Sequence, residues 1–197
     1  QIEITTNEYK VVLNKITKEE FDKAESKKRN VPSVKKVTEI KKIKSILKNQ
    51  LIGEFDEDGY YSIKKIVADN GKEISVHLDE CSITGYFPKY HYLLLECGHS
   101  SDYLINLKIG KDDVNQIGNP DYYLSSPQNT FRLNGYYSGQ SNIHFLEKNN
   151  KNAAPEYLFD ISSLIAADYV ENIFWKNNNT ILFKVDNDYY KIQLKEL

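Results

Sequence analysis

The chain has 197 residues, of which 40% are hydrophobic and 27% charged, and its formal net charge is −2. This composition excludes a disordered chain, and no run approaches the ~18 apolar residues of a membrane-spanning helix, so a membrane span is excluded too. Residues 1–50 carry 13 basic and 7 acidic side chains, whereas residues 51–197 carry 13 and 21; because this main body is acidic, we expect no nucleic-acid partner.

We expect one domain over residues 1–197, since a chain of this length buries about 70% of its unfolded surface in a single core. Residues 1–50 form an N-terminal strand and helical segment in this prediction, and residues 51–197 form an antiparallel β-meander. The fold class is therefore mainly β, with a short N-terminal helical part.

The N-terminal part begins with a predicted strand at residues 8–16, which is followed by a capping box. Thr17 can accept a hydrogen bond from the N–H of Glu20, and the Glu20 carboxylate can return one to the N–H of Thr17. Ile16 and Phe21 can pack together as a hydrophobic staple. The pattern predicts a helix over residues 18–28 that ends before Pro32.

Residues 33–48 carry aliphatic side chains at about every third position, with lysines between them. That spacing favours a second amphipathic helix. The high content of β-branched residues favours a strand instead. Helix and strand both remain open for this segment, with the helix preferred.

From residue 50 onward, strands alternate with turn residues, which is the pattern of a β-meander. Turns are predicted at Asp-Gly, Asn-Gly, Ser-Pro and Asn-rich runs. The predicted strands are 60–67, 73–78, 81–87, 92–97, 102–108, 130–137, 142–148, 156–161, 172–176, 180–185 and 189–194.

Two of these strands, on either side of Phe87-Pro88-Lys89-Tyr90-His91, hold the only two cysteines. A three-residue turn at 88–90 pairs residues whose numbers sum to 178, which places Cys81 opposite Cys97. Directly opposed antiparallel residues lie within disulfide range, so we expect a cross-strand bridge. Two buried free thiols, or a reactive Cys97, are the alternatives.

The next predicted hairpin joins strand 92–97 to strand 102–108 through a four-residue loop that starts at Gly98. With that loop length, Tyr92 pairs with Leu107. Strand 92–97 is apolar on both faces, which is typical of a central, covered strand.

The cysteines also bear on location. They fit an oxidising compartment, and the chain begins at Gln1 without any methionine, as expected after removal of a leader. We therefore expect an exported protein, which is periplasmic, secreted or a lipoprotein of the outer surface.

The strand–turn–strand units repeat faintly. Residues 127–133 with 142–148 are similar to residues 176–183 with 189–195, and residues 92–111 have the same form. Such units resemble blade fragments of β-propellers, in which a Ser-Pro turn precedes the strand, here Ser126-Pro127. About four blades of four strands are the minimum for closure, so we expect propeller-blade-like hairpins that do not close.

Residues 80–150 also resemble a group of uncharacterised exported bacterial proteins. The shared motifs are Gly85-Tyr86, Leu104-Ile105-Asn106, Lys108-Ile109-Gly110 and Ser126-Pro127. This resemblance implies export and a β-meander, and it brings no known activity.

Cys97 and His99 are the nearest approach to a catalytic cluster, because a thiol and an imidazole can form a nucleophile and its base. The disulfide is the competing interpretation, with His99 as a turn residue. A cysteine hydrolase using Cys97 and His99 is therefore kept as an alternative function.

Metal and cofactor motifs are absent from the sequence. The four histidines lack metal-binding spacing, although His77 and Asp79 fall on one side of a predicted strand. Residues 56–59 begin like a calcium loop, but the later oxygen ligands are missing, which favours a hairpin turn. We expect no cofactor and no bound metal.

Fifteen tyrosines include four doublets, and in a strand each doublet can place one ring in the core and one outside. Exposed tyrosines supply contact area for proteins or sugars. Tyr122, Tyr123, Tyr136 and Tyr137 are the candidate binding residues because they flank adjacent turns. Strand propensity also enriches tyrosine and is the competing explanation.

The favoured hypothesis is a non-enzymatic exported binding domain that recognises a protein or a glycan through exposed tyrosines. A second hypothesis is an inhibitor or immunity-type partner of a secreted enzyme, whose acidic body matches a basic target.

Overall fold

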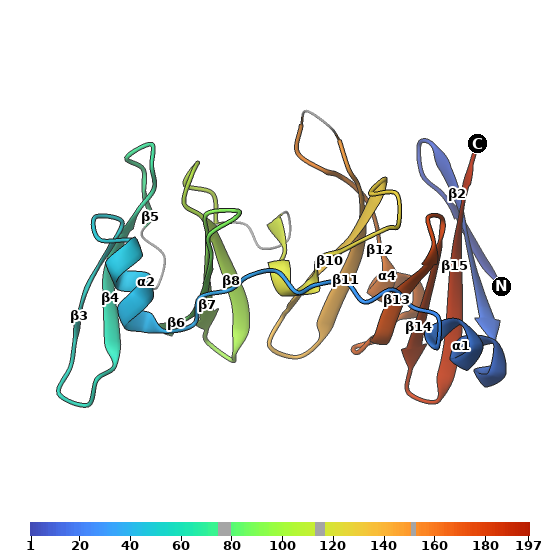
Figure 1. The fold of residues 1–197 in the computed structure, drawn as a ribbon, viewed down its shortest axis with the longest axis horizontal. Helices are drawn as coiled ribbons and strands as arrows, with labels where there is room; N and C mark the ends of the chain where they lie inside the picture. Colours follow the sequence, from blue (N-terminus) through green and yellow to red (C-terminus); the bar gives the residue numbers. More distant parts are fainter. Residues whose placement is uncertain (75–79, 113–116, 151–152) are drawn as a thin grey trace. The chain divides into compact units, whose positions relative to one another are not determined.

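The computed structural model describes residues 1–74, 80–112, 117–150 and 153–197. The fold is mainly β and antiparallel, as predicted, and its described strands form four sheets and no closed barrel (Figure 1). The chain divides into two compact units: residues 1–32, 122–135 and 141–197 form unit 1, and residues 33–121 and 136–140 form unit 2. This division rests on contacts and does not test whether the two units fold together. A single domain over residues 1–197 therefore stays a prediction.

Unit 1 contains two antiparallel sheets. The five-stranded sheet has the order β1 (Ile2–Thr5), β2 (Tyr9–Ile16), β15 (Asp188–Glu196), β14 (Thr180–Val185) and β13 (Glu171–Asn177). The four-stranded sheet has the order β12 (Glu156–Asp160), β11 (Asn142–Lys148), β10 (Phe131–Tyr137) and β9 (Leu124–Ser125). The tip of hairpin β10–β11, residues 136–140, belongs to unit 2.

The core of unit 1 follows from the period-two alternation of its strands. Ile181, Phe183 and Ile192 are fully buried in one hydrophobic cluster with side chains from β2, β10 and β11. In the same cluster the Phe131 ring stacks on Trp175, and the indole N–H of Trp175 donates to the carbonyl of Leu124 at 2.8 Å. The polar N–H of this buried aromatic pair therefore has a hydrogen-bond acceptor within unit 1.

Helix α1 (Lys18–Glu25) begins at the predicted cap, since the Thr17 hydroxyl accepts a hydrogen bond from the N–H of Glu20 at 3.2 Å. Phe21 is buried against Phe174 of β13, with ring centroids 5.4 Å apart. The Glu20 carboxylate instead pairs with Lys191 at 3.1 Å and Lys176 at 3.8 Å, so ion pairs replace the return half of the predicted capping box. The helix is also shorter than predicted.

A short helix that the sequence pattern did not predict, α4 (Ile161–Ile165), follows β12 in unit 1. The Asp160 carboxylate caps it by accepting a hydrogen bond from the N–H of Ser163 at 3.1 Å. The helix ends at Ala166, which has a left-handed backbone. The strand that was predicted to run to residue 161 therefore stops one residue earlier.

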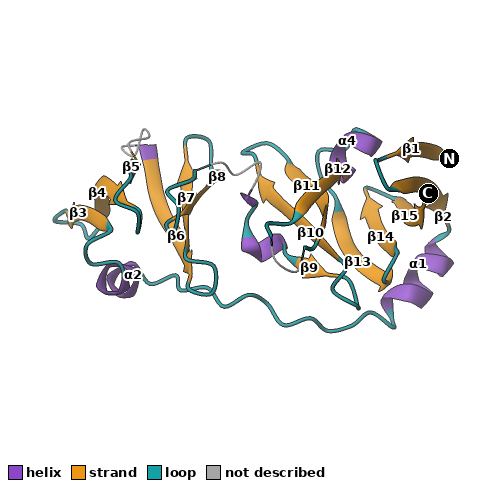
Figure 2. Cartoon of the chain, turned by 90° about the horizontal axis from the view of Figure 1, so that it is seen from above, coloured by secondary structure: helices purple, strands orange, loops and turns teal. Residues whose placement is uncertain are grey.

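Unit 2 also contains two antiparallel sheets, each with its strands in sequence order. One consists of β3 (Leu51–Phe55), β4 (Tyr61–Val67) and β5 (Glu73–Ile74), and the other of β6 (Cys81–Phe87), β7 (Tyr92–Cys97) and β8 (Ser101–Asn106). The remainder of the predicted strand 73–78 lies outside the described residues. Residues of both sheets and of helix α2 (Ile40–Ile46) form one core cluster, and Figure 2 shows α2 beside these strands.

The segment 33–48 is helical only in its second half, which corrects the prediction of one helix over the whole segment. Val37 instead pairs with Tyr86 as an isolated antiparallel bridge, with N–H···O distances of 2.8 and 2.9 Å. Because the backbone groups of Val37 bond to β6, they are not available to a helix. The long-range pairing with β6 therefore decides the first half, and the helical spacing is realised only in the second.

The register of hairpin β6–β7 places Cys81 opposite Cys97, as predicted, but through a different turn. Phe87 pairs with Tyr92, so the turn has four residues and not three. A β-bulge at Thr84 removes the one-residue offset before the cysteines are reached. The two deviations from the predicted geometry cancel.

The register predicted for strands 92–97 and 102–108 is wrong by one residue, because Tyr92 pairs with Asn106 and not with Leu107. The turn contains three residues, and Gly98 and Ser100 both have a positive φ there. A one-residue slip exchanges the two faces of a strand. The prediction that strand 92–97 is central and covered is confirmed, because Leu93, Leu94 and Leu95 are all buried.

None of the helices within the described residues is long and apolar enough to cross a membrane.

Candidate functional site

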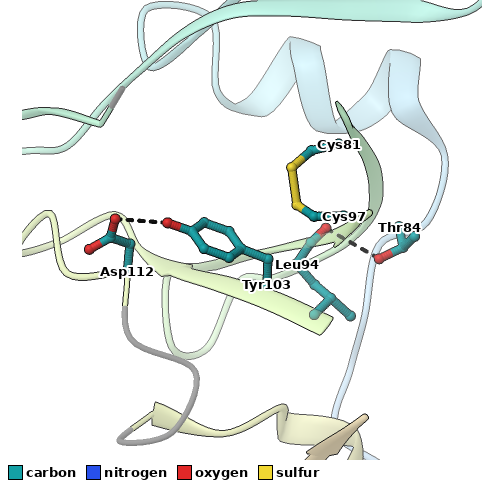
Figure 3. The surroundings of a disulfide bond; sticks show 6 residues. All are labelled: Cys81, Thr84, Leu94, Cys97, Tyr103 and Asp112. Atoms are coloured by element: carbon teal, nitrogen blue, oxygen red, sulfur yellow. Dashed lines mark hydrogen bonds between the residues drawn. A yellow bond between two sulfur atoms is a disulfide. The ribbon is translucent and has the colours of Figure 1, made fainter. Parts of the chain in front are cut away.

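The two cysteines form a disulfide between β6 and β7, with a Cα–Cα distance of 4.2 Å (Figure 3). This confirms the predicted pairing, and no cysteine is free. The cysteine-hydrolase alternative needs a thiolate on Cys97, and the bridged chain does not have one. His99 is an exposed residue of the following turn, as the competing interpretation expected.

A pocket of about 370 Å³ adjoins the disulfide within unit 2. Its lining includes both cysteines, His99, the Tyr103 side chain and the loop residues 138–140. The Tyr103 hydroxyl donates to the Asp112 carboxylate at 2.8 Å, as Figure 3 shows. Burial, followed by the bond and charge of Asp112, raises the pKa of Tyr103, so this phenol stays neutral and does not act as a base at neutral pH.

The loop that closes this pocket is fixed by polar bonds within unit 2. The Ser101 hydroxyl donates to the carbonyl of Ser138 at 2.9 Å, and the backbone N–H of Tyr137 donates to the Asp102 carboxylate at 2.8 Å. The Tyr137 hydroxyl in turn donates to the carbonyl of Gly139 at 3.0 Å. The pocket wall is therefore ordered by the chain itself.

The four tyrosines predicted as binding residues are all half-buried, and they are divided between the units. In unit 1 the Tyr122 ring lies so close to Gly135 that a Cβ there would be 2.9 Å from it, and its hydroxyl donates to the Asn142 side chain at 2.8 Å. The guanidinium of Arg132 lies 3.9 Å from the centre of the Tyr123 ring. Tyr136 and Tyr137 belong to unit 2. The structure therefore gives the Tyr122 and Tyr123 rings internal contacts.

More exposed aromatic side chains lie on hairpin β3–β4 of unit 2, at Tyr60, which is 73% exposed, and Phe55, which is 40% exposed. The neighbouring Tyr61 is buried and packs edge-on against Phe55, with ring centroids 4.9 Å apart. The doublet Tyr60-Tyr61 thus has one ring inside and one outside, which is the arrangement predicted for tyrosine doublets. The doublet pattern in the sequence therefore includes Tyr60, although the predicted binding residues belong to other doublets.

The tip of this hairpin carries three exposed acidic side chains, Asp56, Glu57 and Asp58. Asp56 organises the turn, because its carboxylate accepts hydrogen bonds from the N–H groups of Asp58 at 3.0 Å and Tyr60 at 2.8 Å. This is the predicted hairpin turn. Within the described residues no group of three potential metal ligands comes together, and the predicted pair His77 and Asp79 lies outside them.

A polar chain of side chains in unit 2 was not found from the sequence. The Tyr86 hydroxyl lies 2.7 Å from Nδ1 of His91, and Nε2 of His91 lies 3.2 Å from the Asp69 carboxylate, which also accepts from Gln50 at 2.9 Å. Burial raises the pKa of Tyr86, which is opposite to the activation that a nucleophile needs. These hydrogen bonds therefore connect the β6–β7 turn to the loop between β4 and β5. Only long-range packing brings these residues together, so no local motif indicates them.

Comparison with known proteins assigns no family: no protein-family model matches the chain, and searches of curated proteins and of solved structures returned no match.

Proposed function

We propose that this chain is an exported, non-enzymatic binding domain that recognises a protein partner through hairpin β3–β4. The observation that carries this proposal is the exposure of Tyr60 and Phe55 on one fixed hairpin. Tyrosine and phenylalanine supply much of the binding energy at protein interfaces, because they bury large areas at a small cost in conformational entropy.

The hairpin is suited to this role because it is ordered before binding. Asp56 holds the turn through two backbone hydrogen bonds, and Tyr61 anchors Phe55 from the core side. A pre-organised surface loses little conformational freedom on association. We therefore place recognition here and not at Tyr122, Tyr123, Tyr136 and Tyr137, whose rings are half-buried.

The charge of the hairpin favours a basic partner, since Asp56, Glu57 and Asp58 lie beside the aromatic rings. This supports the second candidate function, an inhibitor or immunity-type partner of a secreted enzyme with a basic surface. The disulfide supports export, because such bonds persist in oxidising compartments.

The test places a photo-crosslinking amino acid at position 60 and, as a matched control, at Tyr157, an exposed tyrosine of unit 1. We expect a specific cross-linked protein from position 60 alone, and its yield should fall in Phe55→Ser and rise at low salt. Equal cross-linking from both positions, or none from position 60, would contradict the proposal.

A further inference from the structure

A second candidate site lies in unit 1, where a groove of about 630 Å³ opens at one end of the five-stranded sheet. Three segments line it: the turn before β10, the turn between β13 and β14, and the end of β15. Its volume falls in the range of small-ligand sites, about 300–1,000 Å³. The lining is mostly polar and includes Gln128, Thr130, Asn177, Asn178, Asn179, Thr180, Gln193, Lys195 and Glu196.

The three segments are tied together by hydrogen bonds. Asn178 accepts from the Ser126 hydroxyl at 2.8 Å and donates to the Thr130 hydroxyl at 3.2 Å, which joins two of the turns. The N–H of Leu194 donates to the carbonyl of Asn179 at 2.9 Å, which fixes the end of β15 to the same turn. The groove is thus pre-formed, and a ligand would not have to order it.

Several amide groups in this groove are available to a ligand. The side-chain amides of Gln128 and Gln193 have no hydrogen-bond partner within the described residues. Asn177 and Asn179 use their side-chain oxygens, and their NH₂ groups bond to nothing in the described part of the chain. Each amide offers one acceptor and two donors, so the groove presents both kinds of group.

The charge of the groove is balanced, since the lining contains one lysine, Lys195, and one glutamate, Glu196. A phosphate or carboxylate ligand is usually held by a guanidinium pair or a cluster of cations, and the lining holds neither. Sugar hydroxyls both donate and accept, which matches a row of amides. We propose that this groove binds a neutral oligosaccharide. The proposal is independent of the β3–β4 hairpin, which lies in unit 2.

The experiment screens the whole chain on an array of neutral, sulfated and uronic-acid oligosaccharides and then measures affinity for the retained neutral glycan by calorimetry. We expect Gln128→Ala and Gln193→Ala each to weaken binding about two- to tenfold, because each removes hydrogen bonds to an uncharged ligand. Both variants should fold normally, since neither side-chain amide bonds to the described part of the chain.

The matched control is Asn187→Ala, which removes an exposed amide from the β14–β15 turn of the same unit, outside the groove. This variant should bind like the unmodified chain. Retention of acidic glycans only, retention of no glycan, or equal losses in the control and the groove variants would each overturn the proposal. If the groove binds a peptide strand instead, no glycan will be retained.

Discussion

The two compact units are built alike, but different interactions close them. In unit 2 each described strand pairs with its neighbour in sequence, and the disulfide between Cys81 and Cys97 staples one hairpin. In unit 1 the five-stranded sheet depends on β2 and β15, which come from opposite ends of the chain. Local pairing with a covalent staple and long-range pairing without one therefore both produce antiparallel sheets. The only tryptophan, Trp175, lies in unit 1, so its fluorescence reports on the unfolding of that unit.

The largest effect is expected from the buried ion pair of unit 1. Arg132 Nη2 lies 2.7 Å from the Glu147 carboxylate, which is only 3% exposed. Arg132→Leu leaves this carboxylate buried without its partner, so we expect a loss of about 3–5 kcal/mol in the free energy of unfolding. Urea unfolding followed by Trp175 fluorescence measures it. Lys184→Leu, which breaks the exposed pair with Glu171, is the control and should change little; equal losses would contradict the prediction.

The disulfide of unit 2 comes next. Replacing both Cys81 and Cys97 by alanine releases a loop with a sequence separation of 16, and should cost about 3 kcal/mol. Hydrogen exchange at β6 and β7 measures this loss. A reductant should destabilise the unmodified chain by the same amount and leave the double variant unchanged.

The same variant tests whether the units unfold together. If its Trp175 transition moves with the exchange at β6 and β7, the two units unfold as one domain, as the sequence predicts. A Trp175 transition that stays in place would instead show that unit 1 is stable on its own.

A smaller effect is expected at the N-cap of α1. Thr17→Ala removes the hydroxyl that accepts from the N–H of Glu20, and it should cost about 1 kcal/mol. Thr17→Ser keeps the cap and should behave almost like the unmodified chain in the same urea titration. A serine variant as unstable as the alanine variant would contradict the role of the cap.

The smallest effect is a pH dependence that comes from His144 in unit 1. Burial lowers the pKa of this imidazole below its usual 6.5, and its Nδ1 is buried without a hydrogen-bond partner among the described residues. The unfolded chain therefore takes up a proton more readily than the folded one, so stability should fall as the pH drops below about 6.5. His144→Gln should flatten this slope when Trp175 unfolding is followed between pH 7 and pH 5. An unchanged slope would contradict the assignment.

The candidate sites differ in whether residues of one hairpin or of distant segments form them. The disulfide could be predicted because both cysteines lie in one hairpin, at nearly equal distances from its turn, and the β-bulge at Thr84 offsets the extra turn residue. The exposed aromatic ring could not be selected in the same way: Tyr122 and Tyr60 both belong to doublets, and only packing half-buries Tyr122 beside Gly135 and leaves Tyr60 exposed. The hydrogen-bonded side chains of Tyr86, His91 and Asp69 and the amide groove in unit 1 could not be predicted from the sequence. Their residues come together only through the fold.

The sequence by itself determined the β-meander, most of its turns, the Thr17 cap and the Cys81–Cys97 pair, because period-two alternation, turn residues and capping act over a few residues. The tertiary structure alone decided that β2 pairs with β15, that Val37 bonds to β6 instead of continuing a helix, and which tyrosine rings stay exposed. The physical reason is that burial and backbone pairing between distant segments outweigh local propensities of a few tenths of a kcal/mol per residue.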